Sequence, residues 1–208
     1  MSFSIKAIRF LGSIIAKLFH PKFKNTIKKT KSVFYGGFYS SSFKSCGVNF
    51  HAEYPIHLIG ENYIEVGNNC SFFSGTRIEI FDKDTNQEFQ PKLTIGNNVN
   101  IINDCHIGCV NQVSIGDNVL IASRVFVTDH FHGSIDTDSI KVSPSDRPIF
   151  SKGPVIIESD VWIGEGVAIM PNVRIGKNSI VGANAVVTKS FPPNSIIGGI
   201  PAKLLRSL

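Results

Sequence analysis

A branched aliphatic residue recurs at every sixth position between Ile157 and Val187 of this 208-residue chain. The series is Ile157, Ile163, Ile169, Ile175, Val181 and Val187, and a glycine follows three of its members at Gly164, Gly176 and Gly182. An amphipathic helix would repeat its apolar residues at three and four positions, and a half-buried strand would repeat them at two. A period of six is typical of a coil in which short parallel strands stack aliphatic on aliphatic. The pattern therefore predicts an all-β solenoid.

The same period extends toward the N-terminus and is interrupted twice. It begins near Ile59, and polar stretches at residues 82–90 and 133–153 break it. Long excursions from a compact domain are more often functional than idle, so the loop at 133–153 is a candidate functional loop. We predict a coil domain over residues 51–208, with a short helix after Pro201 as its C-terminal cap.

Basic and apolar residues are concentrated in the first 31 residues. This segment holds seven Lys, one Arg and no acid, a charge of +8 that leaves −3 for the rest of a chain whose net charge is +5. Residues 3–19 place apolar side chains at helical spacing, but basic residues interrupt them, so the segment falls short of a bilayer span. No small-residue cleavage site follows, which argues against a secretory signal. We predict residues 1–50 to be a basic amphipathic arm, with residues 32–50 as a connector.

Two interpretations of residues 1–31 stay open. A basic amphipathic helix can rest on anionic lipid, which would place the protein peripherally at the inner face of a membrane. It can equally pack on the coil or on a neighbouring subunit. The first interpretation adds membrane-surface contact to the expected partners, and the second adds only protein contact.

Composition argues against several other classes of protein. The basic charge comes with no aromatic-interleaved groove or known binding motif, so nucleic acid is not an expected partner. Four cysteines lack the paired spacing of a secreted disulfide scaffold, which favours the reducing cytoplasm. Cys105 and Cys109 flank His106, but no second pair completes a four-ligand metal site, and we expect these cysteines to be buried fillers.

The stretch VWIGEGVAIMPNVRIGKNSIVGANAVVTKSFPPNSIIGGIPAK resembles the hexapeptide-repeat acyltransferases. The likeness spans about residues 55–206 and is strongest to maltose, galactoside and polysaccharide O-acetyltransferases. It implies a left-handed parallel β-helix, acetyl-CoA as the acyl donor and no metal. It also implies a homotrimer with each active site between adjacent coils.

Acyl transfer from a thioester to a hydroxyl needs a base, and histidine is the natural choice. The segment IGDNVLIASRVFVTDHFH resembles the galactoside-type stretch that ends in the catalytic histidine of the family, and an ungapped count places that histidine on His132. His130 is the alternative. If the segment is extended, only one of the two is expected to face a given cleft, and we favour His132. Asp129 could orient a histidine or contact the acceptor. Asn103 matches an acceptor-contacting residue of the family if a one-residue gap is allowed in the alignment.

The resemblance also assigns a groove for coenzyme A. Its small or polar lining corresponds to Gly164, Ala183, Thr188 and Lys189, its aromatic residue to Trp162, and its phosphate-binding cations to Lys203 and Arg206. Phosphates favour Lys and Arg, and a narrow pantetheine slot favours small residues. Glu165 departs from the family pattern, which often has a small residue there whose backbone meets the pantetheine arm.

These observations predict an O-acetyltransferase that moves an acetyl group from acetyl-CoA to a sugar hydroxyl, on a surface polysaccharide or its lipid-linked precursor. A small free acceptor such as a sugar, an amino sugar or an antibiotic is the alternative. A further alternative is a non-catalytic or metal-dependent β-helix, in which His106, His130 and His132 would have to converge on one metal.

Overall fold

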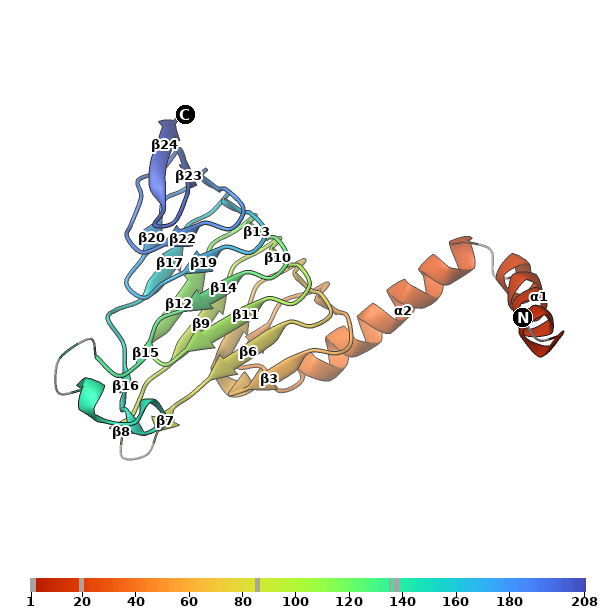
Figure 1. Cartoon of the computed structure of the whole chain (residues 1–208), viewed down its shortest axis with the longest axis horizontal. Helices are drawn as coiled ribbons and strands as arrows, with labels where there is room; N and C mark the ends of the chain where they lie inside the picture. The colour runs from red at the N-terminus through yellow and green to blue at the C-terminus, as the bar shows by residue number, and fades with distance from the viewer. Residues whose placement is uncertain (1–2, 19–20, 85–86, 135, 137–138) are drawn as a thin grey trace.

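The computed structural model describes residues 3–18, 21–84, 87–134, 136 and 139–208. The body is a coil of three sheets with two helices extending from its N-terminal end (Figure 1). Sheet 1 contains β1 (Ser45–Cys46), β4 (Ile64–Val66), β9 (Lys92–Ile95), β12 (Gln112–Ile115), β17 (Val155–Ile157) and β20 (Arg174–Ile175). Sheet 2 contains β2 (His51–Ala52), β5 (Ser71–Phe72), β10 (Asn100–Ile101), β13 (Leu120–Ile121), β18 (Trp162–Ile163), β21 (Ile180–Val181), β23 (Ser195–Gly198) and β24 (Lys203–Ser207). Sheet 3 contains β3 (His57–Ile59), β6 (Arg77–Ile80), β11 (His106–Cys109), β14 (Phe126–Thr128), β19 (Ala168–Ile169) and β22 (Val186–Val187).

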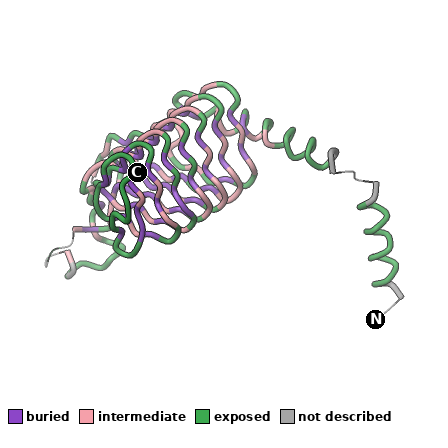
Figure 2. The backbone as a smooth tube through the Cα atoms, turned by 90° about the horizontal axis from the view of Figure 1, so that it is seen from above, coloured by how far each residue is buried: buried purple, intermediate pink, exposed green. Residues whose placement is uncertain are grey.

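Aliphatic side chains fill the inside of the coil. Successive strands of each sheet pair in parallel, except for the antiparallel pair β23–β24 at the end of sheet 2. The six-residue repeat therefore stacks one aliphatic on the next, as Ile95, Ile115, Ile157 and Ile175 do in sheet 1. Full burial of each such side chain stabilises the fold by roughly 1.5–3 kcal/mol. The buried residues run the length of the coil interior in Figure 2. The predicted parallel β-helix is confirmed.

Asparagine and aspartate line the corner between sheets 1 and 2. Asn69, Asn98, Asn118 and Asp160 all have left-handed backbone, with φ between 57 and 62°. Asparagine and aspartate tolerate this conformation better than other non-glycine residues. The side-chain amide of each Asn donates to the residue one coil further on, at 3.1 Å from Asn69 to Asn98 and 2.9 Å from Asn118 to Asp160. The corner is thus built from local turn chemistry and a ladder of amides.

Both interruptions of the repeat leave the coil at the corner between sheets 3 and 1. The first forms a hairpin of β7 (Lys83–Asp84) and β8 (Gln87–Glu88). The second contains β15 (Phe131–His132) and β16 (Ile149–Phe150), which pair antiparallel, with short 3₁₀ turns at Ser139–Lys141 and Pro144–Asp146 between them. A third 3₁₀ turn, Glu61–Tyr63, lies in the first coil.

The N-terminal arm consists of α1 (Phe3–Leu18) and α2 (Pro21–Ser40). The predicted helical arm is confirmed, but residues 32–40 are not a connector because α2 continues through them. Gly36 explains the difference, since a Cβ there would lie 2.3 Å from the Phe50 carbonyl oxygen. A close approach to the first coil thus favours glycine inside a helix despite its low helix propensity.

The C-terminal end of α2 covers the first coil. Tyr35 and Tyr39 pack against the core, and Phe43 and Phe50 continue it with rings 5.5 Å apart. The side chains of α1, by contrast, are exposed from residue 5 to residue 16. Within the described ranges, neither helix combines the length and the apolar character needed to cross a bilayer.

The chain ends in a strand, so the predicted C-terminal helix is wrong. β24 pairs antiparallel with β23, which would otherwise present unpaired backbone groups at the end of sheet 2. Backbone pairing therefore outweighs the helical preference of residues 203–207. The segment still covers one edge of the coil, as a strand.

Candidate active site

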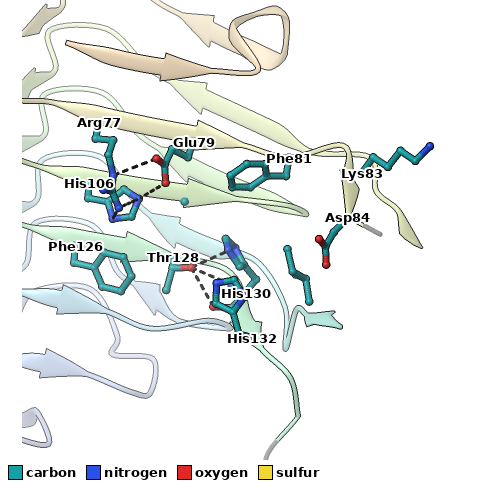
Figure 3. Close-up of a pocket in the computed structure, with 12 residues that line it drawn as sticks. Arg77, Glu79, Phe81, Lys83, Asp84, His106, Phe126, Thr128, His130 and His132 are labelled. Atoms are coloured by element: carbon teal, nitrogen blue, oxygen red, sulfur yellow. Dashed lines mark hydrogen bonds and ion pairs between the residues drawn. The ribbon is translucent and has the colours of Figure 1, made fainter. Parts of the chain in front are cut away.

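The outer face of sheet 3 forms the wall of a cavity of about 330 Å³ (Figure 3). The cavity is lined by Arg77, Glu79, Phe81, Lys83, Asp84, His106, Gly108, Phe126, Thr128, His130, His132 and Ile149. These residues come from β6, β11 and β14 and from both excursions of the chain. The loop at 133–153, predicted to be functional, therefore contributes to the same cavity as the candidate histidines.

Two rows of side chains cross the three strands of this wall. Paired residues of parallel strands point to the same side of the sheet. The first row consists of Arg77, His106 and Phe126, and the second row consists of Glu79, Gly108 and Thr128. Neighbouring strands lie about 4.8 Å apart, which separates the outer members of a row by about 10 Å. The glycine between Glu79 and Thr128 leaves space in the middle of the second row.

His130 follows β14 and rests on a fully buried carboxylate. Asp129 has 0% of its surface exposed, and it accepts hydrogen bonds from the backbone N–H groups of Val110 at 3.0 Å and Asn111 at 2.8 Å. The Nδ1 atom of His130 lies 2.9 Å from Asp129 Oδ1. An ionised carboxylate can only accept hydrogen bonds, so this network assigns the ring proton to Nδ1. Nε2 is then free to take a proton from a hydroxyl in the cavity.

The chain around Asp129 is fixed on several sides. The Ser151 hydroxyl donates to the Asp129 carbonyl at 2.7 Å, and the Thr128 hydroxyl donates to the His130 carbonyl at 3.1 Å. Behind the site, burial first and the charge of Asp129 second raise the pKa of the Cys109 thiol. A neutral buried thiol is a poor nucleophile, so Cys109 serves as packing behind a site that works by general-base chemistry.

His132 lies in the same cavity but is held differently. It sits in β15 opposite Ile149, and its ring is centred 6.3 Å from that of His130. No hydrogen-bond partner for the His132 ring is found among the residues that the structure describes. The expectation that only one of these histidines would face the cleft is wrong, because residues two apart along an extended chain share a side. The geometry favours His130, because only His130 has an orienting carboxylate.

Gly108 makes room for His130, a role that the sequence did not reveal. A Cβ at this position would lie 3.1 Å from His130 Cε1 and 3.5 Å from Thr128 Oγ1. The imidazole cannot easily withdraw because its Nδ1 is bound to Asp129. The available signal was a glycine at an outward position of a strand, where it weakens the strand and often marks close approach of another group.

A second polar cluster lies at the other end of the wall. Glu79 is 3.2 Å from His106 Nε2 and 3.4 Å from Arg77 Nε, and Arg77 Nη2 is also 3.1 Å from His106 Nδ1. Burial and the Arg77 charge lower the pKa of His106. Sequence reasoning missed this cluster, although the alternation of Arg77, Ile78, Glu79 and Ile80 places polar residues on the outer face of one strand.

The predicted coenzyme residues lie mainly on sheet 2 and on its corner with sheet 3. Trp162 projects from β18 with 51% of its surface exposed. Gly164 approaches the next coil so closely that a Cβ would lie 2.7 Å from the Ala183 nitrogen. Glu165 lies at this corner and forms an ion pair with Arg124. Gly164 is thus required by the packing of the corner, whatever binds outside it.

The remaining predicted residues are dispersed. Thr188 and Lys189 follow β22, where the Lys189 ammonium lies 5.7 Å from the centre of the Phe191 ring. Lys203 and Arg206 are exposed on β24. Asn103 lies in the corner between β10 and β11, and its amide donates to the Ser74 carbonyl at 3.2 Å. In this single chain, none of the five lines the cavity that contains His130.

Metal-binding geometry is not seen in the described part of the chain, where no group of three or more His, Cys, Asp or Glu is placed to hold an ion. His106, His130 and His132 line one cavity without forming such a group. His106 is engaged with Arg77 and Glu79, and His130 with Asp129. A zinc site built from these three imidazoles would have to break both networks.

A family model described as bacterial transferase hexapeptide (six repeats) matches residues 154–189. WbbJ of Escherichia coli K12, provisionally named a lipopolysaccharide biosynthesis O-acetyl transferase, is 35% identical over 74% of this chain and 76% of its own length. The galactoside O-acetyltransferase of the same organism is 27% identical over 96% of this chain and 79% of its own. The crystal structure of AntD, an N-acyltransferase from Bacillus cereus, superposes with a TM-score of 0.69 at 23% identity, covering 82% of this chain and 86% of that one.

The chain belongs to the hexapeptide-repeat O-acetyltransferase family. The likeness to AntD bears on the fold alone, and it agrees with the left-handed β-helix predicted from the sequence. The predictions of an acetyltransferase and of acetyl-CoA as its donor are confirmed. The histidine base, the coenzyme groove, the trimer and the membrane contact stay predictions.

Proposed function

We propose that this protein transfers an acetyl group from acetyl-CoA to a sugar hydroxyl on a surface polysaccharide or its lipid-linked precursor, with His130 as the general base. The observation that carries the proposal is the Asp129–His130 pair, with Nδ1 and Oδ1 2.9 Å apart at the wall of the cavity. The provisional name of WbbJ and the name of the galactoside O-acetyltransferase support a sugar acceptor.

The mechanism of acetyl transfer follows from the position of the ring proton on Nδ1 of His130, which leaves Nε2 able to accept a proton. His130 Nε2 removes the hydroxyl proton as the acceptor oxygen attacks the thioester carbonyl, and the positive charge that develops on the ring is stabilised by Asp129. The resulting tetrahedral oxyanion collapses, the carbon–sulfur bond breaks, and the protonated ring returns its proton to the leaving thiolate. The products are the acetyl ester and coenzyme A, and no covalent enzyme intermediate is needed.

The donor is held by a groove outside the cavity. Trp162, Ala183 and Thr188 line the pantetheine arm, and Lys203 and Arg206 pair with the phosphates. These positions are supported by the resemblance and by the exposure of the two cations. The protein acts as a homotrimer, in which the neighbouring coil completes the groove. A heterologous interface that closes on itself is compatible with three-fold symmetry.

Residues 1–31 hold the enzyme beside a membrane that carries the acceptor. In α1, Ile8, Phe10 and Leu11 are exposed. The segment itself contains no acidic residue beside its eight basic ones, of which Lys28 forms an ion pair with Glu53 of the coil at 3.0 Å. Basic residues near an anionic surface contribute about 1 kcal/mol each, and the apolar side chains insert at the boundary of the acyl chains. The arm positions the enzyme and takes no part in the chemistry.

The test is release of the coenzyme A thiol from acetyl-CoA in the presence of glycans, nucleotide sugars and small free acceptors. His130→Ala should lower turnover by about 100-fold or more, because general-base catalysis contributes that much. His132→Ala is the matched control and should retain most of the activity. An inactive His132→Ala beside an active His130→Ala would return the role to His132. Activity only on small free acceptors would reject the glycan proposal.

A further inference from the structure

Glu79 occupies an unusual place for a surface carboxylate. Its side chain is 20% exposed, although it lines the cavity, and nitrogen atoms of three residues surround it. His106 Nε2 lies 3.2 Å from Oε2, while Arg77 Nε at 3.4 Å and His57 Nε2 at 3.7 Å approach Oε1. The three partners come from three successive strands of sheet 3, so the carboxylate is fixed in position.

The fixed carboxylate keeps capacity for another hydrogen bond. A carboxylate has about four lone-pair sites, and among the residues that the structure describes only His106 approaches it at a good hydrogen-bond distance. Glu79 and Thr128 flank Gly108 in the wall of the cavity, and the His130 ring leans over the glycine, so Glu79 and His130 face the same space. A hydroxylated ligand in the cavity beside Gly108 would therefore contact His130 Nε2 and Glu79 together.

The charges of the cavity wall are balanced. Its two formal cations, Arg77 and Lys83, are matched by Glu79 and Asp84. A ligand with a net charge gains nothing from such a wall and would lose solvation on entry. Phe81 and Phe126 supply apolar surface beside the polar groups, which is the usual composition of a site for a small molecule.

We propose that Glu79 is the specificity-determining residue of an acceptor subsite beside Gly108, where it accepts a hydrogen bond from a sugar hydroxyl other than the one that His130 deprotonates. The subsite takes a neutral hexopyranose unit with at least two neighbouring hydroxyls. The inference rests on the proposed function for the role of His130, and the geometry of Glu79 and Gly108 supplies the second contact. Arg77 and His106 are positioning residues that hold the carboxylate.

Ligand binding tests the subsite without requiring turnover. Saturation-transfer NMR would measure the binding of methyl galactopyranoside, methyl glucopyranoside, their monodeoxy analogues and the corresponding uronic acids to the full chain. The parent should bind a neutral glycoside more tightly than its uronic acid, and Glu79→Gln should weaken that binding about tenfold or more. One monodeoxy analogue should bind the parent as weakly as the complete sugar binds Glu79→Gln.

Glu65→Gln is the matched control. Glu65 also bridges two basic residues, Lys44 at 2.7 Å and Lys92 at 3.6 Å, but it lies on sheet 1 and outside the cavity. This variant should bind the glycosides like the parent. Unchanged binding in Glu79→Gln, preferred binding of the uronic acids, or no binding of either neutral glycoside by the parent would overturn the inference.

Thiol release with the sugars that bind separates this inference from the proposed function. In Glu79→Gln the loss should appear mainly as a raised KM for the acceptor, whereas a general-base defect lowers kcat. Glycoside binding without any thiol release would reject the proposed transfer to sugars and leave the subsite standing. Thiol release that does not respond to Glu79→Gln would reject the subsite and leave the transfer standing.

Discussion

Gly108 and His130 compete for one small volume on the outer face of sheet 3. The imidazole lies where a side chain at Gly108 would project, with 3.1 Å between its Cε1 and an added Cβ. A methyl group there must displace either the strand or a ring that is tied to Asp129. Either shift would move Nε2 from its position in the cavity.

We expect Gly108→Ala to destabilise the parent by about 1–2 kcal/mol through overpacking. In a His130→Ala background the same substitution should stabilise the fold by about 0.5–1 kcal/mol, since alanine is favoured over glycine inside a strand. Thermal unfolding of the four proteins gives the coupling energy directly. Equal effects in both backgrounds would show that the glycine does not make room for His130.

At the scale of single residues, the sequence predicted the chemical type of the site better than it predicted the individual residues that form it. The place where the repeat breaks drew attention to His130, His132 and Asp129 together. The choice between the two histidines could not come from the spacing of residues along the sequence. It depends on the buried carboxylate of Asp129, which is held by hydrogen bonds from backbone N–H groups one coil earlier. The sequence did not identify Glu79 as a site residue for the same reason, since its partners His57 and His106 lie on other coils.

At the scale of elements, β24 presents the proposed phosphate-binding cations on an added antiparallel strand. Lys203 pairs with Gly198 and Arg206 with Ile196, so both are anchored to the end of sheet 2. Their side chains are exposed, which leaves them available to phosphates. Contacts of this kind weaken as salt screens them.

Replacing Lys203 and Arg206 together with Ala should raise the Kd for acetyl-CoA about tenfold or more at low salt, because charge-assisted hydrogen bonds are lost. The difference from the parent should shrink as salt is added. Isothermal titration calorimetry would measure both effects. Arg174→Ala with Lys177→Ala removes the same charge from β20 and the turn that follows it, where both residues are ion-paired, and should leave the affinity close to that of the parent. Equal affinity in the β24 variant would remove these cations from the coenzyme site.

The elements that the sequence predicted correctly are the ones that repeat. Each short strand of the coil is specified by an aliphatic every six residues and by Asn or Asp at the corner, so neighbouring coils supply the same information again. The ends of the chain lack this redundancy. Gly36 in α2 and the strand over residues 203–207 are both determined by contacts with the terminal coils, and local propensity pointed the other way.

At the scale of the whole molecule, the N-terminal arm has two parts with different surroundings. The end of α2 belongs to the body, because Tyr35 and Tyr39 pack against the core and the Tyr39 hydroxyl reaches the Ile56 carbonyl at 3.5 Å. α1 extends away from the coil in both views of the chain (Figures 1 and 2). The two interpretations of the arm therefore apply to different residues, with packing at the end of α2 and lipid contact at α1.

Deleting residues 1–31 should abolish binding to vesicles that contain phosphatidylglycerol, because it removes the whole +8 segment at about 1 kcal/mol per basic residue near the lipid. The thermal midpoint and the oligomeric state should stay close to those of the full chain, because Tyr35 and Tyr39 are retained. Deleting residues 1–43 should lower the midpoint, since the aromatic cover of the first coil is lost with Phe43. Vesicle co-sedimentation and thermal unfolding measure the two effects separately.

A charge-preserving variant shows which property of α1 binds lipid. Phe10→Ser with Leu11→Ser keeps all eight basic residues and removes two side chains that are 68% and 59% exposed. If the helix inserts its apolar face, this variant should bind the vesicles more weakly than the parent at every salt concentration. If charge alone attracts the segment, the variant should bind like the parent at low salt. A 1–31 deletion that melts much earlier or changes its oligomeric state, with no vesicle binding by the full chain, would make the arm a structural element of the coil.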